Sequence, residues 1–226
     1  MNRNYQRELE TLLSKEELRG KRLFLHSCCA PCSSYVLEFL RQFFRITVFY
    51  YNPNITQESE YRKRVEEQKR LIAEYNDERE EILQKAAGGD SPWYVIDYVD
   101  GDYEVERFLH AVRGMEQCPE GGERCFICYE LRLRETARRA REQGYDFFTT
   151  TLTISPMKNA AKLNEIGEKL SAEYGVAWLP SDFKKKDGYK RSIELSAEYH
   201  LYRQDYCGCA FSKAEREAQE RQKKPL

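Results

Sequence analysis

Short apolar runs alternate along the chain with longer segments of helical periodicity, and this alternation is the strongest constraint on the fold. Five runs rich in β-branched and aromatic residues are predicted as strands. Such alternation predicts an α/β domain with a doubly wound, mostly parallel five-stranded sheet and right-handed crossovers. The predicted strands are 23–27, 46–51, 93–98, 146–153 and 176–179.

Amphipathic segments between these strands are predicted as helices. Ser155 and Pro156 provide a hydroxyl cap followed by a first-turn proline, so we expect a helix to start there. Residues 1–20 are predicted as an N-terminal helical extension, and residues 213–226 as a charged tail. The predicted helices are 33–44, 61–87 ending at Gly88-Gly89, 104–112, 125–143, 155–175 and 192–202.

The size and composition of the chain fit one domain, residues 1–226. Its 226 residues are 41% hydrophobic, which is enough for a single core, and we find no internal repeat or linker. The net charge of −1 does not argue against a nucleic-acid partner if the basic residues gather on one face. No signal peptide or membrane span is evident, so we expect a cytoplasmic protein with reduced thiols.

Seven of the eight cysteines fall in three tight clusters, at 28–32, 125–128 and 207–209. Closely spaced thiolates can converge on one metal, because a single turn of backbone delivers two of them. Disulfides join distant segments instead, and the adjacent Cys28 and Cys29 could pair only under strain. A single buried cysteine often serves as a small hydrophobe. Three clusters in one chain favour a metal centre.

The predicted topology brings two of these clusters together. In an open parallel sheet, ligands bind beyond the carboxyl ends of the strands. Cys28 and Cys29 directly follow the first predicted strand. The helix that leads into the fourth strand starts at the same rim, with Cys125 and Cys128 on one face of its first turn. A helix N-terminus favours thiolates, and four sulfurs are the number that an iron–sulfur cubane needs.

The remaining cysteines leave alternatives open. Cys32 lies one turn into the first crossover helix and could bind the same cluster or a second metal beside it. Cys207 and Cys209 suit two ligands of one ion or a redox pair, and the predicted topology assigns them to no rim. Cys118 lies alone in a loop and is interpreted as incidental.

Several motifs occur in order through nearly the whole chain, outside the first twenty residues and the tail. They are His26-Ser-Cys-Cys-Ala-Pro31, Tyr51-Asn-Pro-Asn-Ile55, Glu60-Tyr61 with Arg64, Pro119-Glu-Gly-Gly-Glu-Arg-Cys125, Cys128-Tyr129 with Arg132 and Leu133, Thr149-Thr-Thr-Leu-Thr-Ile-Ser-Pro156, Asp182-Phe-Lys-Lys185 and Tyr202-Arg-Gln-Asp-Tyr-Cys-Gly-Cys209. One C-x-x-C pair is a weak signal, whereas this ordered set is specific. Together the motifs resemble the non-cobalamin epoxyqueuosine reductases, the QueH family.

The resemblance implies a fold like the adenine nucleotide α-hydrolase group, with added helices and a C-terminal cysteine-containing segment. It implies an oxidoreductase of queuosine biosynthesis that reduces epoxyqueuosine to queuosine at the wobble position of tRNA. It further implies a [4Fe-4S] cluster and an additional mononuclear iron. By matching position, the implied cluster ligands are Cys28, Cys29, Cys125 and Cys128, and the residues available to the second iron are Cys32, Cys207 and Cys209.

Removal of an epoxide oxygen requires two electrons and stabilisation of a developing alkoxide. A cluster can relay electrons singly, and an open-site iron can act as a Lewis acid on the oxygen. We therefore predict catalytic roles for Cys32, Cys207 and Cys209. No segment resembles a flavin, nicotinamide or corrin site, so we expect an external electron donor.

The substrate base would be reached in an anticodon loop, where unstacked bases are accessible. Lys184 and Lys185 lie in a basic loop after the fifth predicted strand, and Lys158 lies at the start of the helix after the fourth. These lysines, together with Arg203, are predicted substrate contacts. The alternative for the lysine run is an ordinary solvated surface.

Two other functions remain open. A tRNA-thiolating ATPase of the same fold would carry a glycine-rich phosphate loop after the first strand, where this chain has cysteines and Pro31. A zinc-stabilised RNA-binding module could use four of the thiolates, but it leaves three clustered cysteines without a role.

Overall fold

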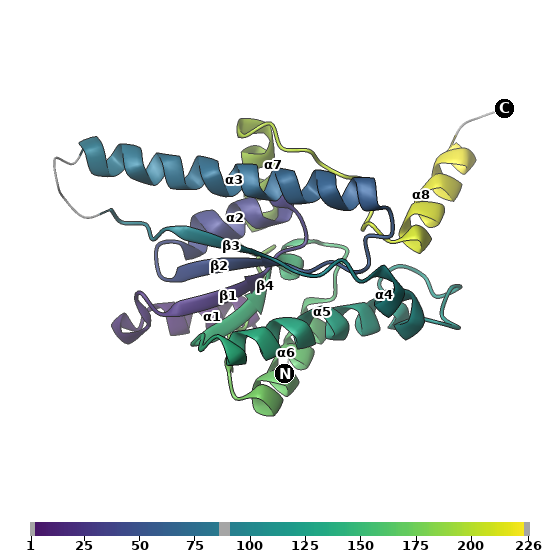
Figure 1. The fold of residues 1–226 in the computed structure, drawn as a ribbon, viewed down its shortest axis with the longest axis horizontal. Coiled ribbons are helices and arrows are strands. Elements are labelled where there is room, and N and C mark those ends of the chain that lie inside the picture. The colour runs from purple at the N-terminus through teal and green to yellow at the C-terminus, as the bar shows by residue number, and fades with distance from the viewer. Residues whose placement is uncertain (1–2, 86–90, 224–226) are drawn as a thin grey trace.

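A single sheet of five parallel strands forms the centre of the computed structural model, which describes residues 3–85 and 91–223 (Figure 1). The strand order is β3-β2-β1-β4-β5, and all four neighbouring pairs are parallel. The predicted α/β class and parallel sheet are confirmed. The strands are β1 (Arg22–His26), β2 (Arg45–Tyr50), β3 (Ile96–Asp100), β4 (Phe147–Thr150) and β5 (Ala177–Trp178).

Helices cover both faces of the sheet. In Figure 1, α2, α3 and α7 lie on one side, and α5 and α6 lie on the other. Within the described residues, no helix combines the length and the apolar character needed to cross a bilayer. The helices are α1 (Tyr5–Leu13), α2 (Ala30–Leu40), α3 (Glu58–Lys85), α4 (Val105–Ala111), α5 (Glu123–Glu142), α6 (Ala160–Tyr174), α7 (Gly188–Glu198) and α8 (Ala210–Lys223), with 3-10 turns η1 (Glu16–Leu18) and η2 (Thr151–Ile154).

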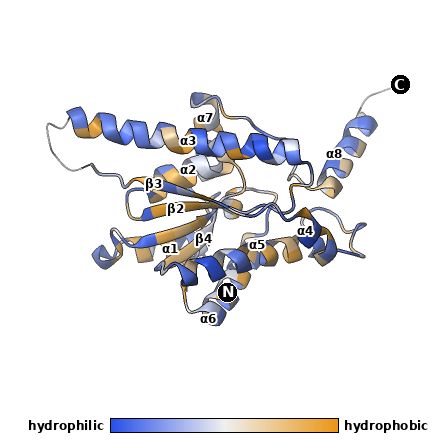
Figure 2. Cartoon of the chain, viewed as in Figure 1, coloured by the Kyte–Doolittle hydropathy of each residue, from blue (hydrophilic) through white to orange (hydrophobic). Residues whose placement is uncertain are grey.

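Alternation along β1 divides the apolar core between the two faces. Leu23 and Leu25 pack with Leu37 of α2, whereas Phe24 between them packs with Leu133 of α5. Successive side chains of a strand point to opposite faces, so a central strand covered on both sides is apolar throughout. Figure 2 shows this as hydrophobic colour concentrated in the strands, while α3 and α8 are largely hydrophilic.

The strand order reverses between β1 and β4. The chain passes from β1 outward to β2 and β3, and β4 and β5 then extend the sheet from the other side of β1. The carboxyl ends of β1 and β4 therefore border the position where open α/β sheets bind ligands. His26 at the end of β1 pairs with Thr150 at the end of β4.

The connection after β4 differs from the prediction. The strand ends at Thr150, and η2 follows it directly. The predicted helix start at Ser155-Pro156 is wrong, because α6 begins at Ala160. Asn159 is the actual cap, since its side-chain oxygen accepts the Lys162 N–H at 3.0 Å.

Other predicted boundaries also shift. Strand β3 begins at Ile96 rather than residue 93, because the Tyr94 N–H is bonded to Arg41 O at 2.9 Å. Helix α7 ends at Glu198 rather than at residue 202. The Leu201 N–H donates to Ser196 O at 2.8 Å, and His200 has a φ of 52°, which ends the helix. The predicted charged tail is largely helical, as α8, and the predicted Gly88-Gly89 stop lies outside the described residues.

Replacement of Gly167 by alanine is expected to destabilise the fold by about 1–3 kcal/mol, in the range typical of overpacking. A Cβ at this position of α6 would lie 2.2 Å from Trp178 Cδ2, and the indole is held by a 3.0 Å bond to Asn164. Urea unfolding would measure the loss. In the double variant Gly167→Ala/Trp178→Leu, the loss should be smaller than the sum of the two single losses. An alanine variant as stable as the wild type would contradict this packing argument.

Candidate metal centre

Three sulfurs lie together at the carboxyl end of β1. Cys28 follows the strand, and Cys29 is the N-cap residue of α2, which places Cys32 in the first turn of that helix. The three Sγ atoms all lie within 4.8 Å of one another, with 3.8 Å between Cys28 and Cys29. The structure thus puts Cys32, which was predicted as available to the second iron, beside two predicted cluster ligands.

The contacts among the three thiols favour a thiolate at Cys28 over one at Cys29 or Cys32. Hydrogen bonds from Cys29 and Cys32 hold the pKa of the Cys28 thiol well below its usual value. The same contacts raise the pKa of Cys29 to about 12 and that of Cys32 well above its usual range. The Cys28 N–H donates to Thr151 Oγ1 at 3.3 Å, just beyond β4. A metal bound here would replace the remaining thiol protons.

The second pair of cysteines begins α5 at the same rim, as predicted. Gly122 is the N-cap residue of this helix, and the Gly121 N–H donates to Cys125 Sγ at 3.2 Å. Burial raises the pKa of both thiols, that of Cys128 to about 11. Cys128 packs in one apolar cluster with Cys209, so the second and third cysteine clusters adjoin.

The C-x-C pair also reaches this rim, which the predicted topology left open. Arg64 of α3 donates from Nη1 to Cys207 O at 3.1 Å and from Nε to Glu60 at 2.7 Å. The Thr56 N–H donates to Gly208 O at 3.2 Å. Gly208 has a φ of 117°, a conformation that requires glycine. These contacts attach the C-terminal loop to the edge of the sheet.

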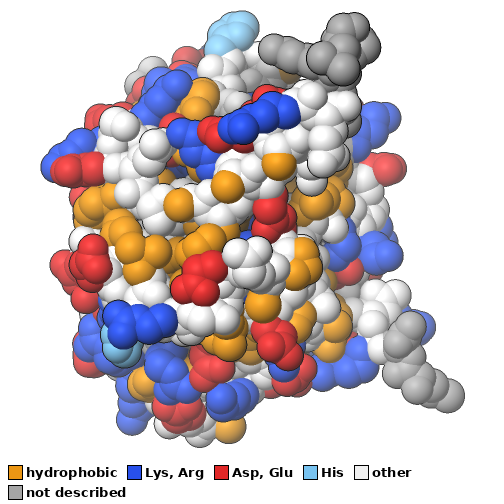
Figure 3. Space-filling model, turned by 90° about the vertical axis from the view of Figure 1, so that its right-hand side faces the viewer, with side chains coloured by type: hydrophobic (Ala, Val, Ile, Leu, Met, Phe, Trp, Pro, Cys, Tyr) orange, Lys and Arg blue, Asp and Glu red, His pale blue; other side chains and the backbone are white. Residues whose placement is uncertain are grey.

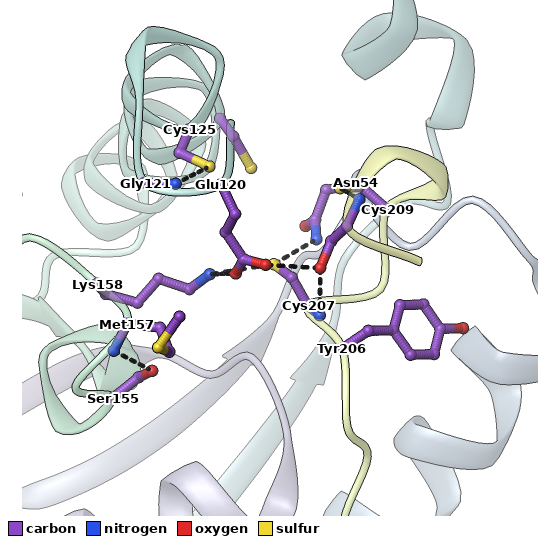
Figure 4. Close-up of polar contacts among 12 residues, drawn as sticks. Asn54, Glu120, Gly121, Cys125, Ser155, Met157, Lys158, Tyr206, Cys207 and Cys209 are labelled. Atoms are coloured by element: carbon purple, nitrogen blue, oxygen red, sulfur yellow. Dashed lines mark hydrogen bonds and ion pairs between the residues drawn. The ribbon is translucent and has the colours of Figure 1, made fainter. Parts of the chain in front are cut away.

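A cavity of about 560 Å³ lies between the first and third cysteine clusters. Lys158 and Glu120 point into it and meet at Cys207 (Figure 4). The Lys158 Nζ lies 2.9 Å from Glu120 Oε1 and 3.3 Å from Cys207 Sγ. Burial alone would lower the pKa of Lys158, but Cys207 and Glu120 raise it well above its usual value. The ammonium therefore stays charged. The cavity is lined by the sulfurs of Cys28, Cys32 and Cys207, by the acidic residues Glu120, Asp205 and Glu215, and by the basic residues Arg64, Arg132, Lys158, Arg203 and Arg216.

The C-terminal helix completes one wall of this cavity. Ser212 of α8 donates to Glu120 Oε2 at 2.7 Å, and Glu215 accepts the Glu120 N–H at 3.1 Å. Glu215 also forms a 2.9 Å ion pair with the buried Arg124 of α5. Glu120 is thus fixed by α8 as well as by Lys158.

The mouth of the cavity carries apolar and basic side chains. Met157 is 66% exposed and Tyr189 is 37% exposed, and both line the cavity together with the exposed Arg203. The face drawn in Figure 3, on the side of α4 and α8, has apolar side chains across its middle with acidic and basic groups around them. The rim therefore offers both stacking surfaces and charge.

The predicted substrate contacts have different locations. Lys158 is only 8% exposed and faces the cavity, whereas Lys185 is exposed on the loop before α7. Lys184 is paired with Asp182, and Arg203 donates to Ser196 Oγ at 3.0 Å. Cys118 lies outside the group of three sulfurs, on the loop between α4 and α5.

Three residues of this centre have no role that the sequence predicts. Glu120 holds Lys158, Asn54 Nδ2 lies 3.8 Å from Cys207 Sγ, and Arg132 Nη1 lies 3.9 Å from Cys128 Sγ. Each lies within or beside a motif of the resemblance, and that is the only sequence signal for them. Their residue types are usually solvated, and local periodicity does not show that they are buried.

A family profile and several individual relatives all identify the family that the sequence motifs resemble. The family profile described as "Epoxyqueuosine reductase QueH" matches residues 23–215. A relative of that name from Staphylococcus epidermidis is 42% identical over 213 residues, covering 92% of this chain and 84% of the relative.

Two further relatives bear the same name. The protein from Streptococcus pyogenes is 40% identical over 92% of this chain and 78% of its own length. The protein from Thermotoga maritima is 34% identical over 86% of this chain and 91% of its own length. The chain belongs to the epoxyqueuosine reductase QueH family.

Proposed function

We propose that this chain reduces epoxyqueuosine to queuosine in tRNA, using a [4Fe-4S] cluster and an adjacent iron. Membership of the QueH family makes the chain an oxidoreductase of queuosine biosynthesis. The observation that supports the metal chemistry is a cavity lined by cysteines of the first and third clusters, with Cys128 of the second cluster packed with Cys209 of the third. A reaction on tRNA fits the cytoplasmic location expected from the sequence.

The donor set suits iron. Thiolates are soft ligands that bind iron–sulfur clusters, and a set of seven exceeds the four that a cubane requires. When bound, the cluster would supply electrons one at a time from an external donor, and the iron would polarise the epoxide oxygen. The proposed cluster ligands are Cys28, Cys29, Cys125 and Cys128, and those proposed for the iron are Cys32, Cys207 and Cys209.

Lys158 provides a fixed cation within the cavity. Its Nζ is directed toward Cys207 by Glu120, which Ser212 holds from the other side. We propose that this ammonium donates a hydrogen bond to the oxygen released from the epoxide. A preorganised donor in a site largely closed to water stabilises developing negative charge more than the same group would in water.

The substrate base must leave its stack to enter the cavity. Single-stranded loops permit this, and flipped bases commonly stack on exposed apolar or aromatic side chains. Met157 and Tyr189 occupy suitable positions at the mouth. We propose that Arg203 and Lys185 contact the phosphate backbone of the tRNA. The positive charge of Lys184, beside Lys185, would add to this attraction.

The metal composition of protein purified without oxygen tests this proposal. We expect a brown protein with iron and acid-labile sulfide in cubane proportion, plus extra iron. Cys207→Ser and Cys209→Ser should keep the cubane, lose the extra iron and lose turnover on epoxyqueuosine-containing tRNA. Cys118→Ser is the matched control. Full turnover in both C-x-C variants would contradict the role of the second iron. A colourless protein that contains zinc would instead support the zinc-stabilised RNA-binding module. Tight binding of ATP would support the tRNA-thiolating ATPase.

A further inference from the structure

Arg132 of α5 is a fully buried cation at the cysteine centre. Its side chain is 1% exposed, and it contacts three different segments of the rim. Nε lies 3.2 Å from His26 Nε2 at the end of β1, and Nη2 donates to Asn52 Oδ1 after β2. Nη1 lies 3.9 Å from Cys128 Sγ, one turn earlier in α5.

Arg132 differs from the other buried arginines in having no carboxylate partner. Within residues 3–85 and 91–223, it forms no ion pair with an acidic side chain. An unpaired buried charge costs several kcal/mol, so a compensating negative charge is expected close by. The ion pairs of the other three are Arg41–Glu78 at 2.8 Å, Arg64–Glu60 at 2.7 Å and Arg124–Glu215 at 2.9 Å.

The hydrogen-bond partners of Arg132 are neutral. His26 Nε2 lies 3.2 Å from Arg132 Nε and 3.1 Å from Tyr51 O, and Nδ1 lies 2.8 Å from Thr150 Oγ1. An imidazole that accepts from the guanidinium at Nε2 keeps its single proton on Nδ1 and is uncharged. Asn52 is oriented by a 2.8 Å bond from Nδ2 to Ser27 O. Neither side chain supplies negative charge.

Sulfur is the neighbour that can carry the compensating charge, because each carboxylate that lines the same cavity faces a cation of its own. These pairs are Glu120–Lys158, Glu215–Arg124 and Asp205–Arg216. Arg132 lines the cavity with Cys28 and Cys207, and Cys128 lies against its Nη1. Each of the three cysteine clusters therefore places one thiol either against this guanidinium or in the cavity that Arg132 lines. All three thiols belong to the centre to which the proposed function assigns iron.

We propose that Arg132 is the internal counter-ion of the metal–thiolate centre and raises its reduction potential. This inference rests on the proposed function. Adding an electron to an anionic centre is easier beside a buried positive charge, because Coulomb interactions are strong where water is excluded. Arginine does not lose its proton at accessible pH, so the effect is constant across the working range. Arg132 acts through the centre and is a positioning residue.

Potentiometric titration of the anaerobically purified protein tests this inference. Arg132→Gln should reduce the equilibrium constant for one-electron reduction at least tenfold, which equals a potential about 59 mV more negative. Arg132→Lys keeps the charge and should give a clearly smaller shift. Arg41→Gln removes a buried arginine at the far end of α2 and should leave the potential unchanged.

Asn52→Asp gives an independent test that keeps Arg132 in place. A carboxylate at the same position would neutralise the guanidinium, so the potential should fall in the same direction as in Arg132→Gln. This variant remains informative if Arg132→Gln does not fold.

The outcomes separate this inference from the proposed function. A wild-type protein with a cluster, together with unchanged potentials in Arg132→Gln and Asn52→Asp, would overturn the counter-ion role and leave the proposed function standing. A wild-type protein without a cluster would overturn both. Cluster loss in Arg132→Gln but not in Arg132→Lys would support the need for charge, whereas loss in both would contradict it.

Discussion

Replacement of Cys28 by alanine is expected to lower both the iron content and the rate of epoxyqueuosine reduction more than about 100-fold. Substitution of a residue that only supports a metal ligand typically costs about 10–100-fold, and loss of a ligand itself should cost more. The Cys28 sulfur lies within 4.8 Å of the Cys29 and Cys32 sulfurs, at the position where the strand order reverses. Iron analysis and turnover on epoxyqueuosine-containing tRNA would measure the two losses.

Cys118→Ala is the matched control for this variant. Cys118 is a half-buried cysteine outside the three clusters, so its removal should change neither quantity appreciably. Equal losses in the two variants would point to a general effect of removing a cysteine. Retention of iron in Cys28→Ala would remove this residue from the proposed ligand set.

Lys158→Met is expected to abolish most turnover and to destabilise the protein by about 3–5 kcal/mol, the range found when one member of a buried pair is removed. The ammonium is 8% exposed and its partner Glu120 is 21% exposed, so the variant leaves a carboxylate uncompensated in the cavity. Denaturant unfolding and single-turnover assays would separate the two effects.

The double variant Lys158→Met/Glu120→Gln distinguishes stability from chemistry. Neutralising Glu120 should restore much of the stability, because the uncompensated charge is gone. Turnover should stay low if the ammonium contacts the reacting oxygen. Recovery of turnover together with stability would show that Lys158 only balances the charge of Glu120.

Much of the sheet and half of the cysteine centre could be predicted from the sequence, because both depend on local patterns. Strand β1 is a continuous apolar run, and its end fixes the place of Cys28. A helix that returns to β4 must start at the same rim, so Cys125 follows from connectivity alone. Elements defined by their own periodicity were therefore placed correctly.

The C-terminal part of the centre depends on contacts between distant segments. Cys207 reaches the rim because Arg64 binds its carbonyl and Thr56 binds the next one. The hydrophobic periodicity of the sequence does not predict such contacts between distant segments. Helix α8 was not predicted, because half of its 14 residues are charged and its apolar residues are few. Its position is set by the hydrogen bonds of Ser212 and Glu215 to the loop before α5.

The distribution of the three cysteine clusters along the chain has a consequence for biosynthesis. The ribosome releases residues 28–32 first and residues 207–209 much later, and domains form as the chain emerges, at roughly 5–20 residues per second. The wall formed by Cys207, Glu120 and α8 can close only after nearly all of the sheet has emerged. The nascent protein therefore holds an open thiol site while it is being translated, and a metal could bind all of the proposed ligands only after elongation has passed residue 209.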